Sequence, residues 1–227
     1  MCFSVQADVA VGLALVPVAV LALREVRCRR ELPFAALPAV FALHQLVEAV
    51  VWLGLDGDVS AHVQSLAAFA YLVVALPLLP TLLPIAVLLL EPQGFRARVL
   101  PFLAVGLLVT AWLTYGLLDG PVRVVRHAHA LEYDTGVQYG NAFAALYVVA
   151  VIGPALVSGY RSIVAFGAIN LVGLVAVGLL FVSAFDSLWC VLAAVVSVLA
   201  LVHMRRRRRL PDPHRLRGLT GAVPATC

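Results

Sequence analysis

Four residues of one apolar segment could perform acid–base or binding chemistry: His44, Gln45, Glu48 and Trp52. The spacing puts His44, Glu48 and Trp52 on one face of a helix. An ionised carboxylate inside an apolar segment is costly, so Glu48 must be paired or protonated there. The pattern predicts either a proton, metal or ligand site on this helix, or a buried polar clamp that holds helices together.

A second candidate cluster consists of His127, His129 and Glu132. The stretch 122–133 is rich in β-forming residues, so a short hairpin is expected within the connection 119–139. In a strand, His127 and His129 would lie on one face, and two imidazoles with a carboxylate could bind Zn²⁺ or Cu²⁺. The alternative is that these are solvated loop residues, since the HExxH pattern of zinc hydrolases is missing.

The four cysteines are Cys2, Cys28, Cys190 and Cys227. Their spacing fits neither a zinc motif nor a CxxC redox pair, and it predicts no disulfide framework. Cys2 is a candidate ligand-site residue at the outer face. It could instead be a reactive thiol, a partner for Cys190, or a buried interfacial thiol.

Several function classes are excluded by missing residues. The sequence contains no Walker motif, dinucleotide fingerprint, GxSxG elbow or haem CxxCH. All 16 basic residues are arginine, so no lysine could form a retinal Schiff base. The run Arg205–Arg209 follows a long apolar segment, which is typical of a topology anchor beside lipid headgroups rather than of nucleic-acid binding.

The composition predicts that these residues are held by a membrane-embedded helix bundle. Hydrophobic residues make up 63% of the 227 residues and charged residues 12%, which fits a surface that faces lipid. The fold class is all-α: a polytopic bundle of seven transmembrane helices in one domain, residues 1–204. We expect the helices at about 6–23, 33–55, 61–90, 99–118, 140–158, 162–184 and 187–204.

The distribution of arginine predicts the orientation of the bundle. With seven crossings, Arg123 and Arg126 lie on one side and every other arginine on the opposite side. The positive-inside rule then places the N-terminus outside and an Arg-rich, disordered tail, residues 205–227, in the cytoplasm. This pattern predicts a multi-pass protein of the cell inner membrane.

Two further features bear on the site. The polar residues of the apolar segments fall mostly in the outer half, whereas the inner half has Asn170 and little else before the arginines, so a cavity is expected to open outward. The third helix contains Pro77, Pro80 and Pro84, which predict a kinked or broken helix. These prolines could form a gating hinge or a static kink.

The start Met1-Cys2-Phe3-Ser4, the segment 31–38, and the later residues Gln45, Glu48 and Trp52 carry a resemblance. They resemble a family of uncharacterised bacterial multi-pass membrane proteins that begin Met-Cys-Phe-Ser and have a Gln-Gln-x-x-Glu-Gly segment in the second helix. The resemblance supports Cys2, Gln45, Glu48 and Trp52 as site residues and implies no activity. His44 stands where the family pattern has glutamine, which favours hydrogen bonding over metal binding there.

Three functions remain open on the sequence alone. The first is ligand binding, sensing or transport through an outward-facing polar pocket around Glu48, with a small molecule or lipid as the ligand. The second is a membrane-embedded, metal-dependent enzyme at the outer face, similar in class to lipid hydrolases. The third is a structural or assembly protein in the bilayer. The sequence leaves the oligomeric state open.

Overall fold

The computed structural model describes residues 4–127, 130–135, 141–180 and 185–210, and these are mostly helical. The helical class and the short hairpin in the connection 119–139 are confirmed. The elements are α1 (Val5–Arg24), η1 (Arg29–Glu31), α2 (Leu32–Ala35), α3 (Leu37–Asp56), α4 (Ala61–Val73), η2 (Val74–Leu78), α5 (Leu79–Leu90), α6 (Gln93–Arg96), α7 (Leu100–Asp119), β1 (Arg123–His127), β2 (Ala130–Asp134), α8 (Asn141–Leu156), α9 (Arg161–Leu180) and α10 (Phe185–Arg209).

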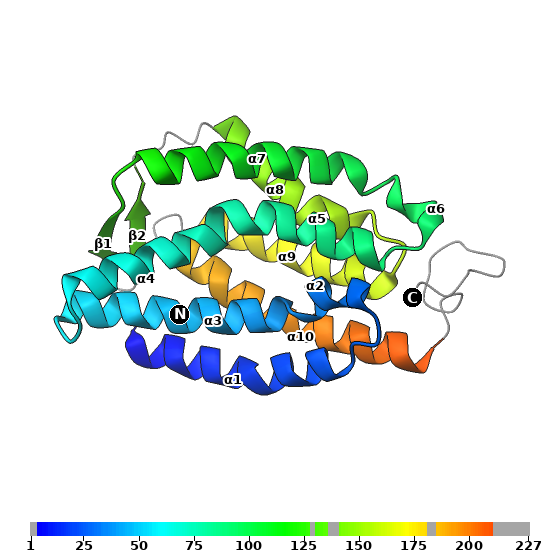
Figure 1. Ribbon diagram of the computed structural model, residues 1–227, viewed down its shortest axis with the longest axis horizontal. Coiled ribbons are helices and arrows are strands. Elements are labelled where there is room, and N and C mark those ends of the chain that lie inside the picture. Colours follow the sequence, from blue (N-terminus) through cyan, green and yellow to red (C-terminus); the bar gives the residue numbers. More distant parts are fainter. Residues whose placement is uncertain (1–3, 128–129, 136–140, 181–184, 211–227) are drawn as a thin grey trace.

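The long helices lie side by side along the long axis of the molecule (Figure 1). Helix α3 packs against α1, α4 and α10, while α5 packs against α7 and α8, and α9 lies between α8 and α10. The hairpin and the α3–α4 turn lie at one end, here called the hairpin end, and α2, α6 and the end of α10 lie at the other (Figure 1). Every described arginine except Arg123 and Arg126 belongs to this second end, here called the arginine end.

Four helical segments of the described chain are long and apolar enough to cross a membrane: Val5–Arg24, Arg29–Asp56, Ala61–Leu90 and Leu100–Asp119. Shorter apolar helices span Ala142–Leu156 and Arg161–Ala176. Large apolar side chains on the outer faces of α1, α7 and α9 are exposed, among them Leu13, Leu108 and Val172. Such a surface suits contact with lipid chains.

Local sequence signals set the limits of the helices around the site. Ser4 caps α1, since its Oγ accepts a hydrogen bond from the N–H of Ala7 at 3.3 Å. Helix α3 ends at Gly57, whose φ of 87° is left-handed and therefore favours glycine. Ser60 caps α4 by accepting from the N–H of Val63. The short turn between these caps reverses the direction of the chain from α3 to α4.

The proline-rich third segment is broken as predicted. Between α4 and α5 the chain forms one π-helical turn, η2, that contains Pro77. Neighbouring side chains bond carbonyls of this turn: Thr110 donates to the Pro77 oxygen at 2.6 Å and Tyr147 to the Ala75 oxygen at 2.5 Å. Helix α7 approaches the start of α5 closely at Gly106, where any Cβ atom would lie only 2.0 Å from the Pro80 oxygen. The contacts match a static kink whose carbonyls are satisfied by α7 and α8.

Thr110→Val removes the donor to the Pro77 carbonyl and the contact between the Thr110 and Thr81 hydroxyls at 2.7 Å. We expect a loss of about 1 kcal/mol in the free energy of unfolding, as is usual for a side-chain hydrogen bond between membrane helices. Unfolding in mixed micelles measures it. Thr114→Val is the control, because Thr114 bonds only the Thr110 carbonyl of its own helix, and an equal loss in both variants would contradict this role.

Some predicted limits differ from the structure. The second predicted helix, 33–55, is interrupted at Ala36 between α2 and α3. Helix α10 continues to Arg209, so Arg205–Arg209 are helical rather than part of a disordered tail, and residues 211–227 lie outside the described residues. Cys28 is disulfide-bonded, although the cysteine spacing predicted no disulfide framework.

Candidate functional site

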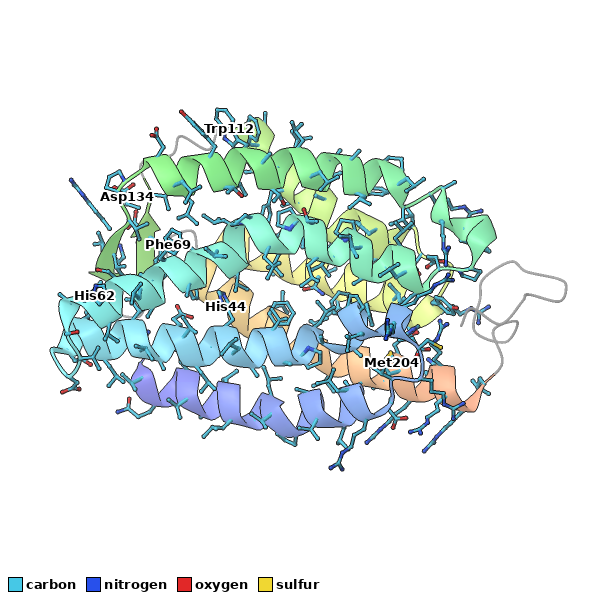
Figure 2. All side chains as sticks on the ribbon, in the orientation of Figure 1. His44, His62, Phe69, Trp112, Asp134 and Met204 are labelled. Carbon is cyan, nitrogen blue, oxygen red and sulfur yellow. The ribbon has the colours of Figure 1, made fainter. Side chains whose placement is uncertain are left out.

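The predicted site residues of α3 form one buried face. His44, Gln45, Glu48 and Trp52 are all at most 2% exposed, and Glu48 is fully buried. Figure 2 shows His44 midway along α3, between the hairpin end and the arginine end marked by Met204. His44 and Gln45 precede Glu48 by four and three residues, and Trp52 follows it by four, so the helix repeat alone brings these side chains together.

Asp8 of α1 joins this face from the neighbouring helix. Helices α1 and α3 are antiparallel neighbours (Figure 1), and Gly12 sits against the Leu46 side chain and the Ala42 oxygen. Asp8 lies one turn before Gly12 along α1, and Glu48 lies about one turn beyond the contact residues of α3. Because the two helices are antiparallel, Asp8 and Glu48 are at the same level of the bundle. Asp8 is also fully buried. The structure thus sets two buried carboxyl groups at one depth of the bundle.

Asp8 was not among the predicted site residues. The sequence contained a usable signal, since Asp8 and Glu48 are both acidic residues inside apolar segments near the same predicted end of the bundle. What the sequence lacked was the packing register of α1 against α3, which the close approach at Gly12 sets.

An aromatic column extends from this face toward the hairpin. The His44 ring stacks on Tyr71 of α4, with centroids 4.0 Å apart, and Tyr71 stacks on Tyr133 of β2 at 4.5 Å. Beside the column, the Arg126 guanidinium lies 5.2 Å from the Trp52 ring centroid and 2.6 Å from Asp56. Two independent contacts thus attach the hairpin to α3 and α4.

The hairpin closes the bundle above the α3 face. Strands β1 and β2 are antiparallel, with Val124 opposite Tyr133 and Arg126 opposite Leu131. Because strand side chains alternate, these four share one face, and Leu131 is buried among Val51, Trp52 and Ala68. Glu48 is fully buried one turn from Trp52, and the outward-facing pocket around it stays a prediction.

Two cavities of the described residues lie elsewhere. An apolar cavity of about 20 Å³, with Asn170 at its edge, lies among α3, α5, α8 and α9. A wide, open groove of about 470 Å³ at the arginine end is lined by Glu25, Arg205, Arg208 and Arg209. Glu48 lines neither of them.

The predicted metal cluster is only partly described. His127 Nε2 and Glu132 Oε2 are 2.5 Å apart on the hairpin, while His129 lies outside the described residues, as does Cys2. Strand alternation puts His127 and Glu132 on the exposed hairpin face, opposite the face that packs on the bundle. His127 and Glu132 therefore do not share a site with the buried Glu48, and within the described residues no three metal-ligating side chains gather.

Binding of Zn²⁺ by His127, His129 and Glu132 stays a prediction. Two imidazoles and a carboxylate could bind Zn²⁺, with solvent completing the shell. We expect titration of the purified protein with Zn²⁺ to show one site that the His127→Ala/His129→Ala double variant loses. His62→Ala is the control at another exposed histidine of the hairpin end, and unchanged binding in the double variant would contradict the prediction.

A second buried polar cluster, which the sequence did not predict, lies at the arginine end. Arg207 Nε is 2.7 Å from Glu31 Oε1, and both side chains are less than a tenth exposed. Arg207 also donates to the Tyr160 hydroxyl at 2.8 Å, while the Arg27 N–H donates to the other Glu31 oxygen at 2.8 Å. This cluster ties the end of α10 to the α1–α2 connection and to the start of α9.

Glu91 and His203 extend the cluster. Glu91, fully buried after α5, accepts hydrogen bonds from the Ser158 hydroxyl and the Gly159 N–H, and His203 is 2.7 Å from the Ser162 hydroxyl. Residues such as Glu31 and Glu91 appeared in the sequence as loop residues among arginines. The bundle buries these two side chains, so the arginine end has more buried polar groups than predicted.

Burial raises the pKa of the Glu91 carboxyl, against the opposing effects of Ser158, Gly159, Arg207 and Arg98. The folded state therefore holds this proton more tightly than the unfolded state, whose carboxyl pKa is 4.5. The stability from Glu91 is complete below that value and is lost as pH rises through the higher folded pKa. We expect wild type to lose unfolding free energy relative to Glu91→Gln as pH rises above 4.5, whereas parallel curves would contradict the shift.

Comparison with known proteins agrees with the uncharacterised-family resemblance. Neither a curated protein nor a solved structure matches the chain. A family model described as a family of unknown function (DUF6629) matches residues 1–215. The chain therefore belongs to this family of unknown function, DUF6629.

Proposed function

We propose that this protein is a seven-helix, multi-pass inner-membrane protein that binds a small cation, in the simplest case a proton, at Glu48 from the outer side. The observation that carries this proposal is the pair of fully buried carboxyl groups, Glu48 and Asp8, at one depth of the bundle. Sensing or transport of that cation would follow from the same site.

The chemistry of a buried acidic pair supports a cation. Two buried carboxylates in an apolar region are costly to keep ionised, because burial disfavours the charged form of each. Exchange of a proton or a small cation is the simplest way for such a pair to change its charge. Ionisable groups inside membrane bundles often mark ion and proton pathways.

The neighbours of Glu48 suit this role. Gln45 offers a carbonyl oxygen and His44 a ring nitrogen on the same buried face, and both are ligands or hydrogen-bond partners of cations. Trp52 closes the hairpin side of the face, with Arg126 over its ring. Arg126 would repel a cation at the entrance, and its ion pair with Asp56 offsets that repulsion.

The orientation follows from the charge of the two ends. Arginines concentrate at one end of the described bundle, and this bias favours that end as the cytoplasmic one. The hairpin end then faces outward, and Glu48 is reached from outside when the hairpin moves. The alternative enzyme has weaker support, since His127 and Glu132 face away from the bundle.

Labelling with dicyclohexylcarbodiimide tests the site, because this reagent reacts with protonated carboxyl groups in apolar surroundings. Purified protein in detergent is labelled at several pH values with Na⁺, K⁺ or choline, and peptide mass spectrometry reads each carboxyl group. We expect label at Glu48 that falls as pH rises or as one cation is added. Label at Glu48 that neither pH nor any cation changes, or no label there, would overturn the proposal.

Two controls belong to this experiment. Glu132 is exposed on the hairpin, so its label reports general changes in reagent reactivity. Asp8→Asn removes the other buried carboxyl group, and we expect it to change the amount of label at Glu48. A polar clamp without exchange would give label that neither pH nor any cation changes.

A further inference from the structure

We propose that the groove between the end of α1 and the end of α10 binds the headgroup of an anionic phospholipid at the arginine end. This inference rests on the membrane-spanning part of the proposed function and is independent of the Glu48 site. The groove is lined by Glu25, Arg205, Arg208 and Arg209 and has a volume of about 470 Å³. That volume lies within the roughly 300–1,000 Å³ of small-molecule sites.

The charge of the groove favours a phosphate group. Glu25 is the one carboxylate in the lining, and it lies 2.6 Å from Arg208 and 3.8 Å from Arg205. Arg209 makes no ion pair with a described residue. Three guanidinium groups around one carboxylate leave an excess of positive charge. Arg205 and Arg208 remain almost half exposed, so their donors can still reach an anion.

The apolar surface next to the groove favours a lipid over a soluble phosphate. Val198 and Val202 of α10 are each 40% exposed, and they continue along the helix into Arg205 and Arg209 at intervals of three and four residues. These four residues share one face of α10. On the adjacent α1, Val20 and Leu23 are also exposed. One lateral surface thus offers an apolar stripe for acyl chains and then arginines for a headgroup.

The position of the groove matches the depth of a headgroup. Helix α1 is long and apolar enough to cross a membrane, and Arg24 and Glu25 lie at its end. The arginines of α10 follow the last apolar turn of α10. Headgroup phosphates lie just outside the hydrocarbon core, where basic residues commonly meet them. A lipid held there would touch both α1 and α10 and would fix the packing of the first helix against the last.

Native mass spectrometry of the full-length protein in detergent tests this site, with phosphatidylglycerol and phosphatidylcholine as probes. We expect phosphatidylglycerol to bind more tightly, and the Arg205→Gln/Arg209→Gln variant to lose roughly 30-fold in affinity. The variant leaves the Arg208–Glu25 pair in place. Glu25→Gln should bind phosphatidylglycerol more tightly, since the competing carboxylate is removed.

The matched control is Arg29→Gln/Arg30→Gln, which removes the same charge from two exposed arginines at the same end but outside the groove lining. We expect this variant to lose less than about threefold, because diffuse attraction is screened. Equal losses in both double variants, or equal binding of the two lipids, would overturn the proposal. Competition by millimolar glycerol phosphate as strong as by the lipid would also overturn it, because the site would then be one for soluble phosphate.

Failure of the membrane assignment would give a different result from failure of the groove proposal. Alkaline carbonate would then release the wild-type chain from membranes, whereas a failed groove leaves it in the membrane with both double variants alike. Glu48→Gln should bind phosphatidylglycerol as wild type does, so failure of the Glu48 site leaves the groove result unchanged.

Discussion

Removing one partner of the Glu31–Arg207 pair is expected to destabilise the protein by about 3–5 kcal/mol, as breaking buried ion pairs usually does. The two groups are 2.7 Å apart and nearly fully buried, so either single variant, Glu31→Gln or Arg207→Gln, leaves its partner without its main contact. Reversible unfolding in mixed micelles, followed by circular dichroism, measures this loss.

The double variant Glu31→Gln/Arg207→Gln should lose less than the sum of the two single losses, because no charge is left buried. Arg208→Gln is the matched control. Arg208 is two-fifths exposed and pairs with Glu25, and a pair of this kind contributes at most about 1 kcal/mol. If Glu31→Gln destabilised no more than Arg208→Gln, the pair would not hold the arginine end together.

Loosening the hairpin is expected to expose the buried Glu48. Leu131 packs against Val51, Trp52 and Ala68, and truncating a buried leucine costs about 2–5 kcal/mol. Because the hairpin touches the bundle through few side chains, Leu131→Ala should release the hairpin before it unfolds the helices. We expect a water-soluble carbodiimide to label Glu48 at least tenfold faster in Leu131→Ala than in wild type.

Arg126→Ala removes the contacts of the hairpin with Asp56 and Trp52 and should act in the same direction with a smaller effect, since that pair is exposed. Val125→Ala is the control, because Val125 lies on the face of β1 that points away from the bundle. An unchanged rate in Leu131→Ala with an intact helical signal would show that the hairpin does not cover the path to Glu48.

The helical architecture could be predicted because membrane-compatible segments are read directly from runs of apolar residues. The three prolines of the third segment predicted its break, although the π-helical form at Val74–Leu78 depends on Thr110 and Tyr147, which belong to other helices. Helix periodicity likewise placed His44 and Glu48 on one face. The β-forming residues of the connection 119–139 predicted the hairpin.

The parts of the site that were missed depend on contacts between distant segments. Asp8 meets the α3 face only through the register set at Gly12, and no local pattern encodes that register. The hairpin packs on α3 and α4 because Leu131 and Tyr133 point inward, a choice of face that alternation alone leaves open. Glu31 and Arg207 are 176 residues apart, and their burial depends on how the ends of the helices fold back.

Labelling of Glu48→Cys from the two sides of the membrane is the most direct test of a site reached from the hairpin end. An impermeant cationic methanethiosulfonate is added to right-side-out and to inverted membrane vesicles, and peptide mass spectrometry reads position 48 apart from the native cysteines. We expect modification from the outer side, and faster modification in the Leu131→Ala background. Modification only from the cytoplasmic side, or from neither side, would contradict an outward-facing cation site at Glu48.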